Sequence, residues 1–232
     1  MTELLTLEHT DRLSTITMDD GKVNAFSPIM LRALHGAFDE AEQAGKVVLL
    51  TGRPGCFSAG FDLGVLRGQP DEVVPMLRLG ATLAQRVLSF PAPVVVACTG
   101  HAFPAGAFLL MAADVRVGAD GPFSLGLNEV RIGLALPEFA VVLARHRLAP
   151  AAFDRTAVTG LMFDPAAARA AGLLDSVVPP EHLHEAARAA AEDLATIDRR
   201  AHHATKLRVR APVLAALQAA IDSELAGVSG AT

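Results

Sequence analysis

Residues 47–63, VVLLTGRPGCFSAGFDL, give the clearest indication of the fold. This stretch begins with an apolar run that is typical of a core strand, and it continues into a turn of small residues. The same order returns about forty residues later, where the strand VVVAC, residues 94–98, leads through Gly100 into AFPAG, residues 102–106. The chain therefore repeats one unit, a core strand followed by a tight turn that opens a helix.

Both turns are expected to present free main-chain N–H groups. The first N–H groups of a helix have no intrahelical acceptor and lie at the positive end of the helix dipole. Pro104 suits the first helical position, so Ala105 and Gly106 carry the free N–H groups of the second turn. In the first turn Gly60 permits an unusual φ, and the N–H of Phe61 follows it. Either turn alone is explained by tight packing, but two of them at the ends of core strands predict an oxyanion hole.

A carboxylate accompanies these turns. Glu129 lies in the stretch GLNEVRIGL, residues 126–134, which is otherwise mostly apolar. Burial disfavours the charged form of a carboxyl group and raises its pKa toward a value useful for taking and returning a proton. The alternative is a surface Glu129 paired with Arg131, and the sequence leaves both interpretations open.

Composition limits the class of protein. The chain has 232 residues, of which 51% are hydrophobic and 19% charged, enough for one domain or one domain with a helical appendage. The net charge of −5, without a long run of Lys or Arg, argues against a nucleic-acid partner. Two cysteines, Cys56 and Cys98, do not form a disulfide framework, and no export signal opens the chain, so we expect a cytoplasmic protein.

Two further classes have no support. The apolar region 90–113 is long enough for a membrane span, but its Pro and Gly residues indicate a strand, a turn and a helix instead. No glycine pattern for nucleotide phosphates is present, and the His pairs do not share a helix face as metal ligands would. We therefore expect no metal and no redox cofactor.

The expected elements alternate between strands and helices, which predicts crossover connections and a mainly parallel sheet. Strands are expected at 4–9, 13–18, 47–52, 94–98, 114–117 and 175–178, and helices at 28–43, 71–89 and 104–113. Residues 64–70 are predicted to be a mobile segment. The chain is largely helical from 137 onward, with helices expected at 138–147, 150–159, 164–171, 181–197 and 200–225.

Five segments in this order resemble the crotonase (enoyl-CoA hydratase/isomerase) family: NAF at 24–26, FSAGFDL at 57–63, HAFPAG at 101–106, GLNEVRIG at 126–133 and ARAAGLLDSVVP at 168–179. The resemblance implies an α/β spiral of ββα units over residues 1–195 and a helical trimerisation segment over residues 196–232. It also implies a homotrimer or a dimer of trimers that binds a bent acyl-CoA, with CoA arriving as part of the substrate.

The resemblance assigns the thioester oxygen to the N–H groups of Phe61 and Ala105, and the proton transfer to Glu129. It implies a CoA- and acyl-binding surface of Val23, Ala25, Ala59, Gly60, Asp62, Leu63, Phe103, Gly106, Phe108, Leu127, Leu136 and Phe139. On the last predicted helix, Lys206 and Arg208 either meet CoA phosphates or form a solvated face.

Phe108 favours one reaction within the family. Hydratases of the family hold water between two carboxylates, and the position of the first is Phe108, which cannot orient or deprotonate water. Glu129 keeps the second position, and one base in a dry pocket suits a double-bond shift through a dienolate. Glu138 either supplies a second acid or begins the helix after Pro137. The remaining alternatives are hydration or thioester hydrolysis by the same hole, and an acyl-CoA-binding protein without turnover.

Overall fold

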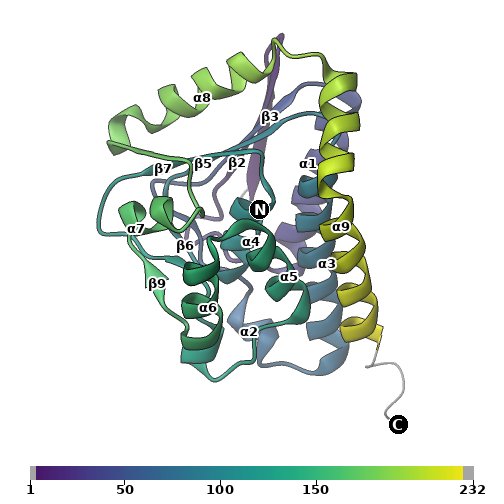
Figure 1. Ribbon diagram of the computed structural model, residues 1–232, viewed down its shortest axis with the longest axis vertical. Coiled ribbons are helices and arrows are strands. Elements are labelled where there is room, and N and C mark those ends of the chain that lie inside the picture. Colours follow the sequence, from purple (N-terminus) through teal and green to yellow (C-terminus); the bar gives the residue numbers. More distant parts are fainter. Residues whose placement is uncertain (1–3, 227–232) are drawn as a thin grey trace.

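The computed structural model describes residues 4–226 and folds them around two sheets (Figure 1). The larger sheet has the strand order β1-β2-β3-β5-β7-β10, and the smaller sheet has the order β4-β6-β8-β9. Only the β1–β2 and β8–β9 pairs are antiparallel among these strands. The strands are β1 (Leu5–His9), β2 (Leu13–Met18), β3 (Val47–Thr51), β4 (Gly55–Ser58), β5 (Val94–Cys98), β6 (Gly100–Ala102), β7 (Val115–Ala119), β8 (Leu125–Gly126), β9 (Met162–Phe163) and β10 (Ser176–Val178).

Helices fill most of the remaining chain. They are α1 (Pro28–Ala44), α2 (Leu63–Leu66), α3 (Pro70–Ser89), α4 (Pro104–Ala112), α5 (Glu138–Arg147), α6 (Pro150–Thr159), α7 (Pro165–Ala170), α8 (Leu183–Leu194) and α9 (Arg199–Ala226), with short 3-10 helices η1 (Glu129–Ile132) and η2 (Pro180–His182). Within residues 4–226, no helix combines the length and the apolar character that crossing a membrane requires.

The repeating unit is a strand of the larger sheet, a strand of the smaller sheet and a helix. The chain runs through it as β3-β4-α2, β5-β6-α4 and β7-β8-η1. This confirms the predicted α/β spiral of ββα units. The strands of the smaller sheet were not predicted, because two to four residues are too few to show a period.

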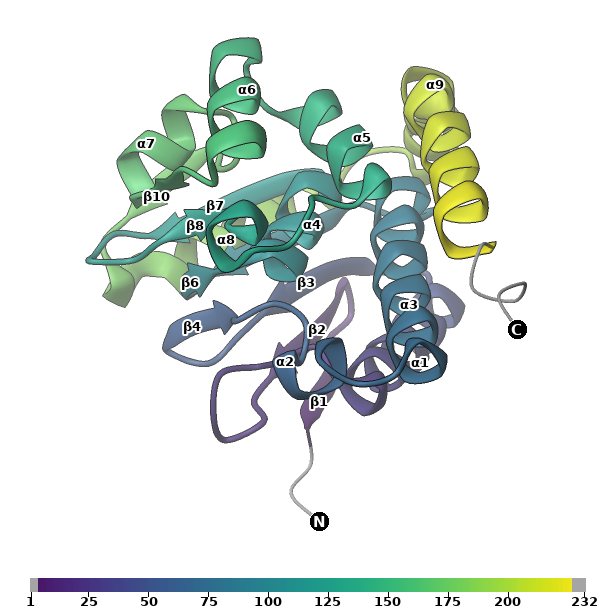
Figure 2. The ribbon, with the colours of Figure 1, turned by 90° about the horizontal axis from the view of Figure 1, so that it is seen from below.

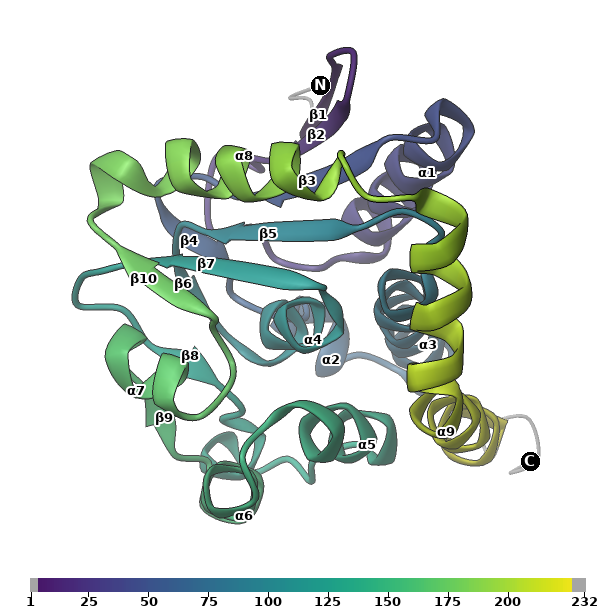
Figure 3. The same ribbon diagram turned by 45° about the horizontal axis from the view of Figure 1, so that its top comes forward.

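The larger sheet is buried on both faces because successive side chains of a strand point to opposite sides. Val48 and Leu50 belong to the main core, which includes α1, α3 and α4, whereas Val47 and Leu49 pack with α8 on the other face. Figure 3 shows α8 running alongside the strands on one side of the sheet, and α3 and α4 side by side on the other. This double covering explains the unbroken apolar runs in the sequence.

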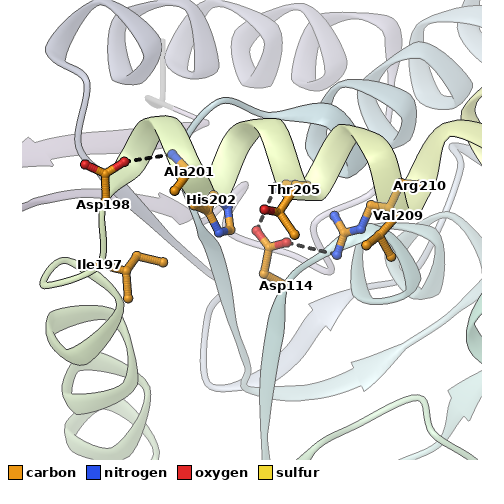
Figure 4. Close-up of a pocket in the computed structure, with 9 residues that line it drawn as sticks. Asp114, Ile197, Asp198, Ala201, His202, Thr205, Val209 and Arg210 are labelled. Atoms are coloured by element: carbon orange, nitrogen blue, oxygen red, sulfur yellow. Dashed lines mark hydrogen bonds and ion pairs between the residues drawn. The ribbon is translucent and has the colours of Figure 1, made fainter.

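A buried ion cluster attaches α9 to the sheet (Figure 4). Asp114, which precedes β7, accepts hydrogen bonds from Lys206 Nζ at 2.7 Å, from Arg210 at 2.9 Å and from the N–H of Val94 at 2.7 Å. Burial lowers the pKa of Lys206 to about 8, and Asp114 partly offsets this effect. Lys206 is therefore buried and does not belong to a solvated face, so that interpretation was wrong for this residue, whereas Arg208 is exposed.

Most predicted elements are confirmed, and two regions differ from the prediction, which had no helix over residues 64–70 and one continuous helix over 181–197. Residues 64–70 contain part of α2, which begins where the Asp62 carboxylate accepts the N–H groups of Gly64 and Val65. The helix predicted over 181–197 divides into η2 and a shorter α8. Figure 2 shows α2 between β4 and the start of α3, beside the turns that follow the smaller sheet.

The ion cluster predicts a large loss of stability when its only carboxylate is neutralised. Asp114→Asn leaves two buried cations without a counter-charge, and breaking a buried pair in this way costs about 3 kcal/mol. Urea unfolding of the variant is expected to show this decrease in unfolding free energy. The control is Asp154→Asn on the exposed side of α6, expected to change it by less than about 0.5 kcal/mol. Equal small effects of both variants contradict the role of the cluster.

Candidate active site

The first predicted turn follows β4 and has the expected left-handed glycine, with φ +86° at Gly60. Ser58 fixes the turn, because its Oγ accepts the N–H of Gly60 at 3.1 Å and donates to the carbonyl of Asn24 at 2.7 Å. The N–H of Phe61 has no hydrogen-bond acceptor within the described part of the chain. It is a free donor beside the turn.

The second turn follows β6, the parallel neighbour of β4. Pro104 occupies the first helical position of α4, and Ala105 follows it without an acceptor for its N–H among the described residues. The two turns touch, since the N–H of Phe103 donates to the carbonyl of Ser58 at 2.9 Å. A Cβ at Gly60 would lie 3.5 Å from the nitrogen of Ala105. Phe61 and Ala105 therefore lie at adjoining turns, as the sequence predicted.

Glu129 begins η1, and Leu127 and Asn128 connect it to β8, the third strand of the same sheet. Only 7% of the residue is exposed, and burial raises the pKa of its carboxyl group to about 7, although its own N–H opposes the rise. Oε2 has no hydrogen-bond partner among the described residues. Arg131 does not pair with it, because the Arg131 side chain donates to the carbonyl of Gly160 at 2.7 Å. The alternative of a surface ion pair is therefore wrong.

A cavity of about 430 Å³ joins the turns and Glu129. Its walls come from the turns after β4 and β6, from α2, α3 and α4, and from the segment around η1. The lining residues are Ala59, Phe61, Leu63, Leu66, Val73, Leu77, Phe103, Pro104, Phe108, Asn128, Glu129, Ile132, Leu134, Ala135 and Pro137. Glu129 is the only ionisable side chain among them, so the cavity offers one proton-transfer group in apolar surroundings.

The predicted binding residues divide into three groups. Six of the predicted site residues line the cavity: Ala59, Phe61, Leu63, Phe103, Phe108 and Glu129. Others lie in the turns or behind the wall without lining it: Gly60, Ala105, Gly106, Leu127, Leu136 and Phe139. Val23, Ala25 and Asp62 lie outside it, on the loop before α1 and at the start of α2.

Phe108 and Glu138 are the residues that separate the possible reactions. Phe108 is buried, with its ring centroid 6.2 Å from that of Phe61 and 5.6 Å from that of Phe139. Glu138 is exposed at the start of α5, where its carboxylate accepts from Ser223 of α9 at 3.3 Å. Glu138 does not line the cavity.

Residues 64–74 were expected to form part of the pocket wall, and Leu66 and Val73 of that segment line the cavity. The individual lining residues of α3 and of the segment after η1 were not predicted. Val73 and Leu77 are four residues apart and therefore share one helix face, a spacing that was visible in the sequence. Asn128 was also missed, and among the described residues that line the cavity it is the one polar side chain besides Glu129.

Comparison with known proteins identifies the family. Residues 8–229 match the family model described as enoyl-CoA hydratase/isomerase. A putative enoyl-CoA hydratase from Thermus thermophilus is 35% identical over 206 residues, covering 86% of this chain and 78% of that protein. The chain therefore belongs to the crotonase family of enoyl-CoA hydratases and isomerases, whose members act on acyl-CoA thioesters.

Solved structures agree on the fold. An enoyl-CoA hydratase/isomerase family protein from Pseudomonas syringae has a TM-score of 0.95 and 45% identity, with 97% of each chain covered. A Mycobacterium tuberculosis protein has a TM-score of 0.94 and 40% identity, with 98% of this chain and 100% of that chain covered. That protein is described as an enoyl-CoA isomerase in one structure and as a probable enoyl-CoA hydratase in another. The descriptions of these relatives therefore do not decide between isomerisation and hydration, and the choice must be argued from the residues of the site.

The raised pKa of Glu129 predicts a pH-dependent penalty in stability. A folded-state pKa near 7, against 4.5 for a free carboxyl group, means that the folded protein loses stability as pH rises from about 4.5 to about 7. The largest loss of unfolding free energy that this pKa shift can cause is about 3 kcal/mol. Glu129→Gln is therefore expected to be more stable than wild type in chemical denaturation at pH 8 and not at pH 4.5. A difference that does not depend on pH contradicts this origin.

Proposed function

We propose that this member of the family is an enoyl-CoA isomerase that moves a double bond of the acyl group from carbon 3 to carbon 2. The observation that carries the proposal is the single ionisable side chain, Glu129, in the apolar wall of the cavity. A double-bond shift needs one group that removes a proton and returns it. Hydration additionally needs a positioned water molecule.

The proposed reaction uses Glu129 twice. Its carboxylate takes a proton from C2 of a 3-enoyl thioester, and the electron pair moves through the carbonyl carbon onto the thioester oxygen. The N–H groups of Phe61 and Ala105 stabilise that oxyanion. Glu129 then returns the proton to C4, the electrons move back and the double bond forms between C2 and C3. No atom is gained or lost.

The environment of Glu129 suits both steps. A carboxyl group with a pKa near 7 is partly deprotonated at neutral pH, so it can accept the first proton, and it is acidic enough to return that proton. The unpartnered Oε2 leaves one oxygen available to the substrate. The surrounding apolar side chains limit the access of water to the dienolate.

Phe108 supports isomerisation over hydration. Hydratases of the family carry a carboxylate at the position that matches Phe108, and this ring can neither orient nor deprotonate water. Glu138 offers no substitute where it lies, because its carboxylate contacts Ser223. Hydration or thioester hydrolysis would need an acid from outside the described cavity.

We also propose where CoA binds and how the subunits assemble. We assign CoA to the turn residues Val23, Ala25 and Asp62 outside the cavity, and the acyl chain to the cavity itself. A homotrimer or a dimer of trimers would cover the exposed apolar side chains of α9, where Leu207 and Val209 face outward.

Glu129→Gln tests the shuttle directly. The amide is of similar size but cannot accept the proton, so turnover of 3-hexenoyl-CoA to 2-hexenoyl-CoA is expected to fall by at least about a thousandfold. Glu138→Gln is the matched control and is expected to keep more than half of the activity. The assignment is reversed if Glu138→Gln removes activity while Glu129→Gln keeps it. Tight binding of acyl-CoA by wild type without turnover supports a binding protein.

The pH profile provides an independent test. Because the base must be deprotonated, kcat/KM is expected to rise with pH and to level off above an apparent pKa near 7. The substrate used must not titrate in this range, so that the pH profile reports the protonation of Glu129 alone. A profile that is flat between pH 5 and pH 8 contradicts the assignment of Glu129 as the base.

A further inference from the structure

Gly80, in the middle of α3, leaves a recess that the Phe61 ring fills. A Cβ placed at Gly80 would lie 2.4 Å from Cε1 and 2.5 Å from Cζ of Phe61, far inside van der Waals contact. Glycine weakens the interior of a helix relative to alanine, so its presence at a buried helical position calls for a packing reason. The Phe61 ring supplies that reason.

The recess lies on the cavity side of α3. Leu77, one turn before Gly80, lines the cavity, and residues three apart share a helix face. Phe61 lines the same cavity, and its ring meets Phe108 of α4 edge-on at 6.2 Å. The ring therefore lies between α3 and the open space, and the depth of the recess decides how far the ring projects into that space.

The main chain at Phe61 is held on both sides. The carbonyl of Gly60 accepts the N–H of Phe26 at 2.8 Å, and the N–H of Asp62 donates to the carbonyl of Phe26 at 3.4 Å. The Asp62 carboxylate also caps α2. A group added at Gly80 is thus relieved by turning the Phe61 side chain, and the cavity is the side with free space.

We infer that Gly80 is a specificity-determining residue: its recess keeps the Phe61 ring out of the acyl cavity and so admits long acyl chains. The inference rests on the proposed placement of the acyl group in this cavity. The ring must move by about 1 Å to restore ordinary contact with an added methyl group. Short acyl groups end before they reach the ring, so their affinity should not change.

Calorimetric titration with saturated acyl-CoA thioesters tests the inference without any turnover. Gly80→Ala is expected to raise the Kd of dodecanoyl-CoA about tenfold, equivalent to about 1.4 kcal/mol, and that of butanoyl-CoA less than about twofold. The matched control is Gly36→Ala on α1, where an added Cβ meets nothing within 4 Å, and it is expected to leave the chain-length preference unchanged. Equal weakening for all chain lengths, or no weakening, overturns the inference.

The double variant Gly80→Ala/Phe61→Leu distinguishes a clash with the Phe61 ring from a general disturbance of α3. Leucine removes the far edge of the ring but keeps the main-chain N–H, so dodecanoyl-CoA binding is expected to return to within about threefold of wild type. If Gly80→Ala alone does not fold, the double variant still tests the inference, because the Cβ added at position 80 no longer overlaps the far edge of an aromatic ring at position 61. A double variant that still discriminates against dodecanoyl-CoA overturns the inference. Because these ligands do not react, the outcome is independent of whether the enzyme isomerises or hydrates.

Discussion

The site depends on the parallel pairing of β4, β6 and β8 in the smaller sheet. Parallel strands that pair side by side end at the same edge, so the turns after them meet there. Phe61, Ala105 and Glu129 come from those three turns, although up to 68 positions separate them (129 − 61 = 68). Gly100 permits the close pairing, since a Cβ there would lie 2.2 Å from the carbonyl carbon and oxygen of Gly55.

The proposed chemistry depends on the apolar packing around Glu129. Burial among apolar side chains raises the pKa of Glu129 to about 7, and in the proposed reaction the same side chains would limit the access of water to the dienolate. Such a carboxyl group lowers the stability of the folded protein at neutral pH. The fold tolerates this penalty because its large sheet is packed on both faces and α9 is attached by the Asp114 cluster.

The sequence predicted the parts with strong local signals. The helix predicted over 28–43 matches α1, whose ends carry the local signals Ser27, Pro28 and Gly45. The valine-rich runs predicted the inner strands of the larger sheet. The free N–H groups of Phe61 and Ala105 followed from glycine and proline at strand ends. Their residue types are dictated by local backbone geometry, so local reasoning was sufficient.

What the sequence did not predict is set by contacts between distant segments. The smaller sheet escaped notice because pairing, and not composition, defines strands as short as β8. The burial of Lys206 depends on Asp114, 92 residues earlier, and a basic residue on a helix gives no local sign of such a partner. The fit of the Phe61 ring against Gly80 likewise appears only when α3 is placed beside the first turn.

The role of Glu129 as a proton shuttle is tested by following one hydrogen atom through the reaction. A 3-hexenoyl-CoA in which both hydrogens on C2 are replaced by deuterium is converted in a single turnover. The product is examined by mass spectrometry and NMR. Transfer by one buried carboxyl group predicts 2-hexenoyl-CoA with deuterium at C4. A product with a hydroxyl group at C3, or an isomer without deuterium at C4, would contradict the account.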